Sequence, residues 1–137
     1  MYMIIAGCGR LGSSLALRLS AEGNDVAVID QLSKNFETLG HGFNGICVTG
    51  VPIDEDVLKK AEIESADVLI AATPDDNQNI MISQIAKKLY QVPVVITRTS
   101  TPEREQVLRK MGFDTICPTN LAANVLAEKL LAKGTVK

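Results

Sequence analysis

The chain has 137 residues, of which 46% are hydrophobic and 4% aromatic, and its formal net charge is -2. This length is typical of one domain and allows an aliphatic core without disulfides or metal. The balanced charge and the lack of a basic tract argue against nucleic acid as a partner. No apolar run approaches the ~18 residues of a membrane span. We therefore expect one cytoplasmic domain over residues 1–137 with no direct membrane insertion.

The first two predicted elements flank a glycine motif. Residues 1–6 are apolar almost throughout, which predicts a parallel strand buried on both faces. The motif Gly7-Cys8-Gly9-Arg10-Leu11-Gly12 follows, and apolar residues then recur at helical spacing to about residue 22. In such a turn the first glycine permits the bend, the second lets a pyrophosphate approach the backbone, and the third lets the helix pack on the strand. The motif therefore predicts a nucleotide phosphate at a helix N-terminus.

The second strand, residues 25–30, ends in Asp30. In this fold an acid at that position accepts hydrogen bonds from the 2′- and 3′-hydroxyls of a ribose. It would also repel a 2′-phosphate, which argues against NADP. Ser33 is predicted to cap a short helix to Leu39, and residues 46–49 read as the third strand.

The second half repeats the alternation of helix and strand. Asp54 is predicted to cap the next helix, residues 67–72 form a fourth strand, and residues 73–77 are a turn with several cap candidates. The helix that follows carries four apolar residues on one stripe, namely Ile82, Ile85, Ala86 and Leu89.

The remaining elements are shorter until the last helix. Residues 94–97 read as the fifth strand, with Arg98 just past it, and residues 114–117 as a sixth. Between them Pro102 starts a helix whose predicted apolar face is Val107, Leu108 and Met111. Thr119 or Asn120 is predicted to cap a final helix that runs to about Lys133.

This alternation predicts an α/β fold: a Rossmann-type, doubly wound, six-stranded parallel sheet of order 3-2-1-4-5-6 in a single domain. The crevice between strands 1 and 4 should be lined by the glycine turn, Asp30, Ala72 and Thr73. The alternative is a domain that keeps its glycines for packing and has lost its ligand. Cys8, Cys47 and Cys117 adjoin apolar runs and are predicted to be small buried hydrophobes, whereas His41 reads as a surface-loop residue.

Several separated motifs resemble the KTN/RCK family, the N-terminal nucleotide-binding domains of Trk and Ktr potassium-uptake regulators. They are Gly7 to Ala16, residues 56–61, residues 71–79, Ile96-Thr97-Arg98, and Met111-Gly112-Phe113-Asp114 followed by Pro118. The resemblance covers nearly the whole chain.

The resemblance implies a regulatory subunit that binds NAD(H) or ATP/ADP and gates a membrane potassium channel or transporter subunit by changing shape. It implies a homodimer or higher ring at the inner face of the membrane. Arg10 would reach a phosphate, Asp30 would hold the adenosine ribose, and Thr73 and Arg98 would border the phosphates. For Arg98, a salt bridge to an acidic neighbour (Asp75, Asp76 or Glu103) is the alternative. The full candidate set is Gly7, Cys8, Gly9, Arg10, Leu11, Gly12, Asp30, Gln31, Val51, Ala72, Thr73 and Arg98.

Two features depart from the family pattern. Where the family has Gly-Asp-Ala after the third strand, this chain has Gly50-Val51-Pro52. Val51 can offer only apolar packing near an adenine. Family members also commonly continue into a smaller C-terminal lobe, so a chain that stops at Lys137 is expected to be a single-lobe member or a fragment.

The last helix and the missing catalytic groups bear on function. Apolar residues cover more than one face of residues 119–133, which favours an oligomer contact over a helix sunk deeper in its own fold.

A small NAD-dependent oxidoreductase, or a redox sensor with a soluble partner, is the alternative function. Such an enzyme needs an acid/base group, and the sequence has no Tyr-x-x-x-Lys pair that could supply one. We expect no catalytic residues and no metal site.

Overall fold

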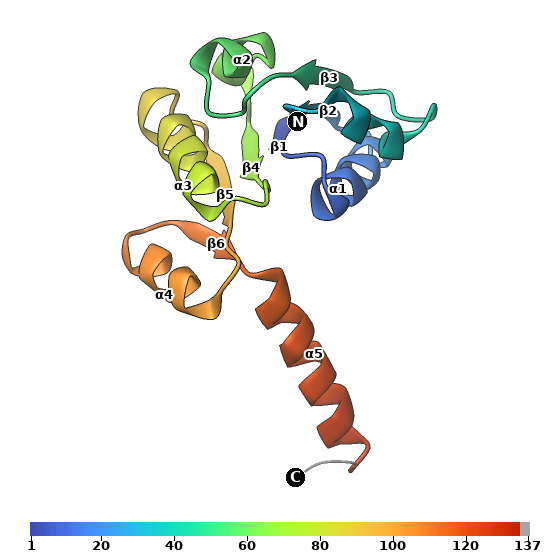
Figure 1. The fold of residues 1–137 in the computed structure, drawn as a ribbon, viewed down its shortest axis with the longest axis vertical. Helices are drawn as coiled ribbons and strands as arrows, with labels where there is room; N and C mark the ends of the chain where they lie inside the picture. Colours follow the sequence, from blue (N-terminus) through green and yellow to red (C-terminus); the bar gives the residue numbers. More distant parts are fainter. Residues whose placement is uncertain (135–137) are drawn as a thin grey trace.

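The computed structural model describes residues 1–134 as a six-stranded sheet with helices on both faces (Figure 1). All strands are parallel, and their order is β3-β2-β1-β4-β5-β6. The predicted Rossmann-type fold and strand order are therefore confirmed. The chain reverses its direction across the sheet between β1 and β4, where such folds open a crevice at the carboxyl ends of the strands.

The elements follow the predicted alternation with small differences at their ends. The strands are β1 (Tyr2–Ala6), β2 (Asp25–Asp30), β3 (Ile46–Thr49), β4 (Val68–Ala71), β5 (Val94–Arg98) and β6 (Asp114–Ile116). The α-helices are α1 (Arg10–Ala21), α2 (Glu55–Lys60), α3 (Asp76–Gln84), α4 (Pro102–Lys110) and α5 (Pro118–Ala132). Two 3₁₀ segments, η1 (Ser33–Leu39) and η2 (Ile63–Ser65), and a π-helical turn, η3 (Ile85–Leu89), complete the chain.

The core has two aliphatic layers, one on each face of the sheet. On one face, alternate residues of the central strands, such as Ile4 and Leu69, pack with Leu58 of α2 and Ile82 of α3. On the other face, α1 and η1 cover the intervening strand residues. Because the central strands are covered on both sides, they are apolar throughout, as their sequence predicted.

Two predicted helix caps are wrong. Ser33 is the first residue of η1, and Leu32 before it makes no side-chain cap bond. The Leu32 N–H instead donates to Asp30. Helix α5 begins at Pro118 after Cys117, and neither Thr119 nor Asn120 caps it. Proline at the first helical position removes a backbone donor that a cap would otherwise have to satisfy. The predicted cap Asp54 does accept an N–H group of its helix. Thr101, for which no cap was predicted, accepts the Arg104 N–H at the start of α4.

Some apolar residues predicted to be buried are exposed. Leu89 lies in η3, whose wider i to i+5 turn takes it off the helical stripe. Val107 and Met111 are exposed because α4 lies beside the edge strand β6 and buries Leu108 alone of the predicted face. Cys47 is exposed on β3, the opposite edge strand, whereas Cys8 and Cys117 are buried.

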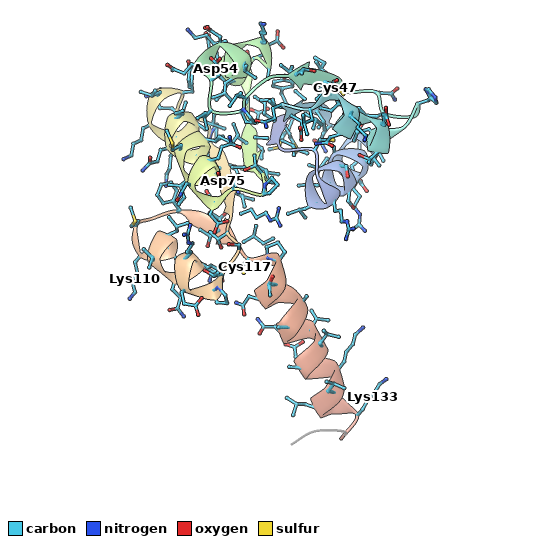
Figure 2. The ribbon with its side chains drawn as sticks, in the orientation of Figure 1. Cys47, Asp54, Asp75, Lys110, Cys117 and Lys133 are labelled. Atoms are coloured by element: carbon cyan, nitrogen blue, oxygen red, sulfur yellow. The ribbon has the colours of Figure 1, made fainter. Side chains whose placement is uncertain are left out.

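Helix α5 extends away from the rest of the domain (Figure 1). Cys117 lies where the helix leaves the domain, and Lys133 lies near its far end (Figure 2). None of the 15 residues of α5 is buried, and its leucines are 41–61% exposed. The alternative, a helix sunk deeper in its own fold, is therefore wrong. No helix within residues 1–134 combines the length and hydropathy that a membrane span needs.

Candidate functional site

The glycine turn is fixed by two close backbone approaches. Gly7 has φ +111°, and a Cβ there would lie 2.7 Å from the Ala72 carbonyl oxygen. A Cβ on Gly12 would lie 1.9 Å from the Gly7 carbonyl oxygen. The first glycine therefore lets β1 run close to the end of β4, and the third lets α1 start close to the turn. At Gly9 a Cβ would meet nothing within 4 Å.

Asp30 ties the end of β2 to this turn. Its Oδ2 accepts the Cys8 N–H at 2.9 Å, and its Oδ1 accepts the Leu32 N–H at 2.8 Å and the Asn35 side-chain amide at 3.0 Å. A carboxylate offers about four acceptor sites. One lone pair on Oδ2 therefore remains for an incoming hydroxyl group, while the other contacts hold the carboxylate in a single orientation.

The opposite wall is the turn between β4 and α3. The Thr73 N–H and hydroxyl donate to Asn79 Oδ1 at 2.9 and 2.7 Å. The Asn79 amide donates to the Thr73 and Arg98 carbonyl oxygens at 2.9 and 3.2 Å. Asp75 caps α3 by accepting the N–H groups of Asn77 and Gln78. This wall is thus built by hydrogen bonds that satisfy every donor and acceptor of a fully buried asparagine.

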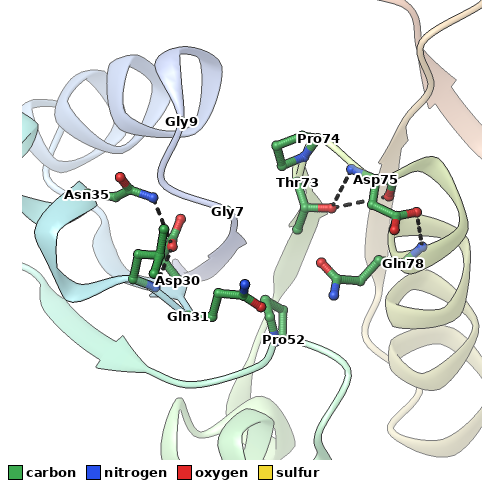
Figure 3. Close-up of a pocket in the computed structure, with 11 residues that line it drawn as sticks. Gly7, Gly9, Asp30, Gln31, Asn35, Pro52, Thr73, Pro74, Asp75 and Gln78 are labelled. Carbon is green, nitrogen blue, oxygen red and sulfur yellow. Dashed lines mark hydrogen bonds between the residues drawn. The ribbon is translucent and has the colours of Figure 1, made fainter.

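Between the two walls lies a crevice of about 620 Å³. Asp30 and Asn35 stand on one side, Thr73, Pro74 and Asp75 on the other, and Gln31 and Pro52 between them (Figure 3). The full lining is Gly7, Gly9, Asp30, Gln31, Leu32, Asn35, Pro52, Thr73, Pro74, Asp75 and Gln78. Small-molecule sites have volumes of roughly 300–1,000 Å³, so the crevice has room for a nucleotide.

The structure brings five of the twelve candidate residues to the crevice wall: Gly7, Gly9, Asp30, Gln31 and Thr73. Four others support this wall from behind. Cys8 donates its N–H to Asp30, Leu11 packs on the core, Gly12 abuts Gly7, and Ala72 abuts the glycine turn.

The three remaining candidates lie at the margin. Arg10 is the exposed first residue of α1. Val51 is exposed next to Pro52, which lines the crevice in its place. Arg98 is half-buried, and its guanidinium donates to the Thr73 carbonyl oxygen at 3.5 Å. Within residues 1–134 Arg98 forms no salt bridge, so the alternative of an ion pair with an acidic neighbour is wrong. Asp76 instead pairs with Arg104 at 3.6 Å.

Sequence reasoning missed seven residues of the site. Six line the crevice, namely Leu32, Asn35, Pro52, Pro74, Asp75 and Gln78, and Asn79 lies behind it. Pro52 and Asp75 are close in sequence to the candidates Val51 and Thr73 and could have been included on that ground. Asn35 reaches the site only because η1 folds back over Asp30, a tertiary contact that no sequence spacing indicates.

The crevice wall carries few charged groups. Its two lining carboxylates are Asp30 and Asp75, and the guanidinium of Arg98 lies behind Thr73.

The one cysteine of the glycine turn is shielded: burial raises the pKa of the Cys8 thiol, which keeps it protonated and unreactive. Residues 1–134 contain no group of three histidine, cysteine, aspartate or glutamate side chains placed to hold a metal ion.

The family model of the TrkA-N domain matches residues 3–119. The chain belongs to this family. The resemblance predicted from the separated motifs is therefore confirmed, since the match runs from β1 to the first turn of α5.

Curated relatives extend the TrkA-N match over the whole chain. The chain is 37% identical over 134 residues to the Trk system potassium uptake protein TrkA of Streptomyces coelicolor, which covers 98% of the chain and 60% of that protein. It is 35% identical over 137 residues to a TrkA homolog of Methanothermobacter thermautotrophicus, covering 99% of the chain and 62% of that protein. The chain thus spans about three fifths of the length of these relatives.

Solved structures share the fold. A Kef C-terminal domain of Shewanella denitrificans in an AMP-bound form superposes with a TM-score of 0.80 at 24% identity, covering 98% of this chain and 82% of that one. The GsuK channel bound to NAD gives a TM-score of 0.69 at 22% identity, covering 85% of this chain and 21% of that one. GsuK bound to ADP gives 0.69 at 21% identity, with coverages of 85% and 31%. At these identities the likeness shows the fold alone.

Proposed function

We propose that this TrkA-N domain is a nucleotide-sensing regulatory domain that binds NAD(H) or ATP/ADP in the crevice between β1 and β4. The observation that carries the proposal is the arrangement around Asp30: one acceptor site remains on a carboxylate held beside the glycine turn and the N-terminus of α1. That arrangement offers a ribose contact and a phosphate contact from adjacent backbone. The AMP, NAD and ADP named for proteins of this fold support the choice of ligand class.

Each element of the crevice has a proposed role. Gly7, Gly9 and the first N–H groups of α1 receive the phosphates, and Asp30 receives a ribose hydroxyl. Arg10 reaches the phosphates from the start of α1, because a guanidinium suits an oxyanion. Arg98 borders them from β5, beside Thr73. The adenine base of the nucleotide lies between Gln31, Pro52 and the exposed Val51.

The regulated partner is proposed to be a membrane potassium channel or transporter subunit, contacted from the cytoplasmic side. The TrkA relatives are named for potassium uptake, which supports this partner. In this role a nucleotide shifts the equilibrium between two arrangements of the domain for which it has different affinities. The ligand then acts as a signal and is not turned over.

The exposed α5 is proposed to be the homodimer contact, or a contact within a higher ring. Leu121, Val125 and Leu126 are 50–61% exposed along one stretch of the helix. A contiguous apolar surface of this kind marks a protein contact. Light scattering should detect a dimer that Leu126→Glu converts to monomer. Leu17→Glu, at a 38% exposed leucine of α1, is the control that should leave the dimer intact. A wild-type protein that stays monomeric at high concentration would exclude this contact.

Titration calorimetry with NAD, NADH, ATP, ADP and AMP tests the ligand class, and mass spectrometry of any co-purified nucleotide identifies the physiological one. Saturable binding of at least one of these is expected. Absence of binding to all of them would refute the proposal. The alternative, a small NAD-dependent oxidoreductase, predicts a change in nicotinamide absorbance when candidate substrates are added, and the regulatory proposal predicts none.

A further inference from the structure

Helix α4 contacts the start of α3, next to the crevice wall, with one residue and the base of α5 with the following residue. Arg104 pairs with Asp76, the first residue of α3, at 3.6 Å. Glu105 accepts the side-chain amide of Asn120, in the first turn of α5, at 3.4 Å. We propose that Glu105 is a positioning residue that sets the direction of α5 and, with Arg104, couples that direction to the nucleotide crevice.

The contact at the base of α5 is well placed to orient the helix. Glu105 is 8% exposed, and its other carboxylate oxygen faces Arg109 of the same helix at 3.5 Å. Arg109 in turn donates to Thr115 of β6 at 3.1 Å. The carboxylate is therefore held by α4 and the sheet edge before it meets Asn120. Because no residue of α5 is buried and only Pro118 and Asn120 are half-buried, this hydrogen bond acts on a helix that packing constrains at its first turn alone.

On the crevice side the Asp76 carboxylate is held in place, whereas the Arg104 side chain that pairs with it is 51% exposed. The Asp76 carboxylate is 8% exposed and accepts the Ser100 N–H at 3.1 Å and its hydroxyl at 2.6 Å, in addition to pairing with Arg104. Asp76 directly follows Asp75, which lines the crevice and caps α3. A ligand that pushes or draws the turn from Thr73 to Asp75 therefore moves Asp76, and with it the N-terminal end of α4.

The coupling is local because adjacent residues of one short helix make both contacts. Helix α4 is nine residues long, so it moves as a rigid body when one end is displaced. This inference rests on the proposed function only for the ligand that moves the crevice wall. The role of Glu105 in orienting α5 is a property of the chain without ligand.

Distance measurement between spin labels tests both parts. One label occupies the exposed Cys47 on β3, and a second is introduced by Glu128→Cys on the exposed α5, while the buried Cys8 and Cys117 stay unlabelled. Labelled chains are diluted with unlabelled chains so that only distances within one chain are read. NADH and ATP are the added ligands, and calorimetry on the same samples reports whether they bind.

In the labelled protein with Glu105 and Asn120 unchanged, the distribution of distances between the two labels should be narrow. Its mean should shift when nucleotide saturates the crevice. Asn120→Ala and Glu105→Ala should broaden the ligand-free distribution and reduce the nucleotide-induced shift to roughly half or less, since the coupling free energy passes through the contact. Glu105→Gln retains the acceptor for Asn120 and should restore most of the shift. Glu103→Ala, at an exposed carboxylate on the same helix, is the matched control and should behave as wild type.

Each outcome decides a separate claim. Wild-type distributions and shifts in Asn120→Ala would overturn the role of Glu105. Nucleotide that binds by calorimetry but leaves the wild-type distance unchanged would overturn the coupling and leave the binding proposal intact. If no nucleotide binds, the proposed function fails, and the width of the ligand-free distributions still decides whether Glu105 orients α5.

Discussion

Asn79 and Thr73 are joined by three hydrogen bonds, two from Thr73 to Asn79 Oδ1 and one from the Asn79 amide to the Thr73 carbonyl oxygen. The pair closes the turn at the end of β4 and thereby shapes one wall of the crevice. The fourth bond of the Asn79 side chain, to the Arg98 carbonyl oxygen, joins this turn to the end of β5. A single buried amide thus holds two strand ends together.

Asn79→Ala is expected to lower the free energy of unfolding by about 2–4 kcal/mol, because it leaves buried donors and acceptors unpaired. Urea denaturation measures this loss. Asn77→Ala, at an exposed residue of the same helix whose backbone N–H alone contacts the Asp75 cap, should change stability by less than about 0.5 kcal/mol. Equal losses in the two variants would mean that the Asn79 hydrogen bonds do not stabilise the turn.

Two glycines of the turn should respond differently to alanine. Gly12→Ala places a methyl group against the Gly7 carbonyl oxygen, so it should cost about 3 kcal/mol or more of stability. Gly9→Ala meets open space, so it should leave stability within about 0.5 kcal/mol of wild type. Because Gly9 lines the crevice, its methyl group should weaken nucleotide binding about tenfold. Unchanged affinity in Gly9→Ala would place the phosphates elsewhere.

Asp30→Ala removes the proposed ribose contact and should weaken nucleotide binding by about 1–3 kcal/mol. It also frees the N–H groups of Cys8 and Leu32, so some stability is lost as well. Asn35→Ala removes one of the bonds that hold Asp30 and leaves its Oδ2 in place. Calorimetry should therefore show a larger loss of affinity for Asp30→Ala than for Asn35→Ala, and the reverse order would contradict the ribose assignment.

Arg10→Ala should weaken ATP binding about tenfold and leave adenosine binding nearly unchanged, because only ATP carries phosphates. Arg18→Ala removes an equally exposed arginine from the far end of α1 and should affect neither ligand. Competition binding against a fluorescent nucleotide measures both affinities. Equal losses for ATP and adenosine in Arg10→Ala would show that Arg10 does not contact the phosphates.

The buried Cys8 should make stability depend on pH in the alkaline range. Burial raises the pKa of its thiol above the unfolded value of about 8.5. The folded state therefore holds this proton more tightly, and the stability it contributes is present below that pH and is lost as the pH rises. Urea denaturation between pH 8 and 9.5 should show this decline, with a smaller slope in Cys8→Ala. The same slope in both proteins would show that the Cys8 thiol does not cause the alkaline loss of stability.

The sheet and half of the crevice were predictable from local patterns. Continuous apolar runs identify buried parallel strands, and the Gly-x-Gly-x-x-Gly turn with Asp30 places the phosphate and ribose ends of a site. These signals are short-range: each depends on a few adjacent residues or on one strand–turn–helix unit. They located Gly7, Gly9 and Asp30 at the wall of the crevice.

Two of the missed residues, Asn35 and Asn79, depend on tertiary contacts. Asn35 lies near Asp30 because η1 turns back toward β2, and Asn79 is buried because it closes a turn that begins six residues earlier. The exposure of Val107 and Met111 follows from the position of β6 at the edge of the sheet, which a helical stripe does not reveal. In each case the sequence predicted the element and did not reveal the surroundings of the side chain.

The exposure of α5 along its whole length has a mechanical consequence. Its 15 residues span about 22 Å at a rise of 1.5 Å per residue, so it is a lever arm anchored at one end. A rotation of about 10° at Pro118 would displace the far end by about 4 Å, given that length. A nucleotide-dependent tilt of this size at the base of α5 would therefore displace a protein attached at its far end by about 4 Å.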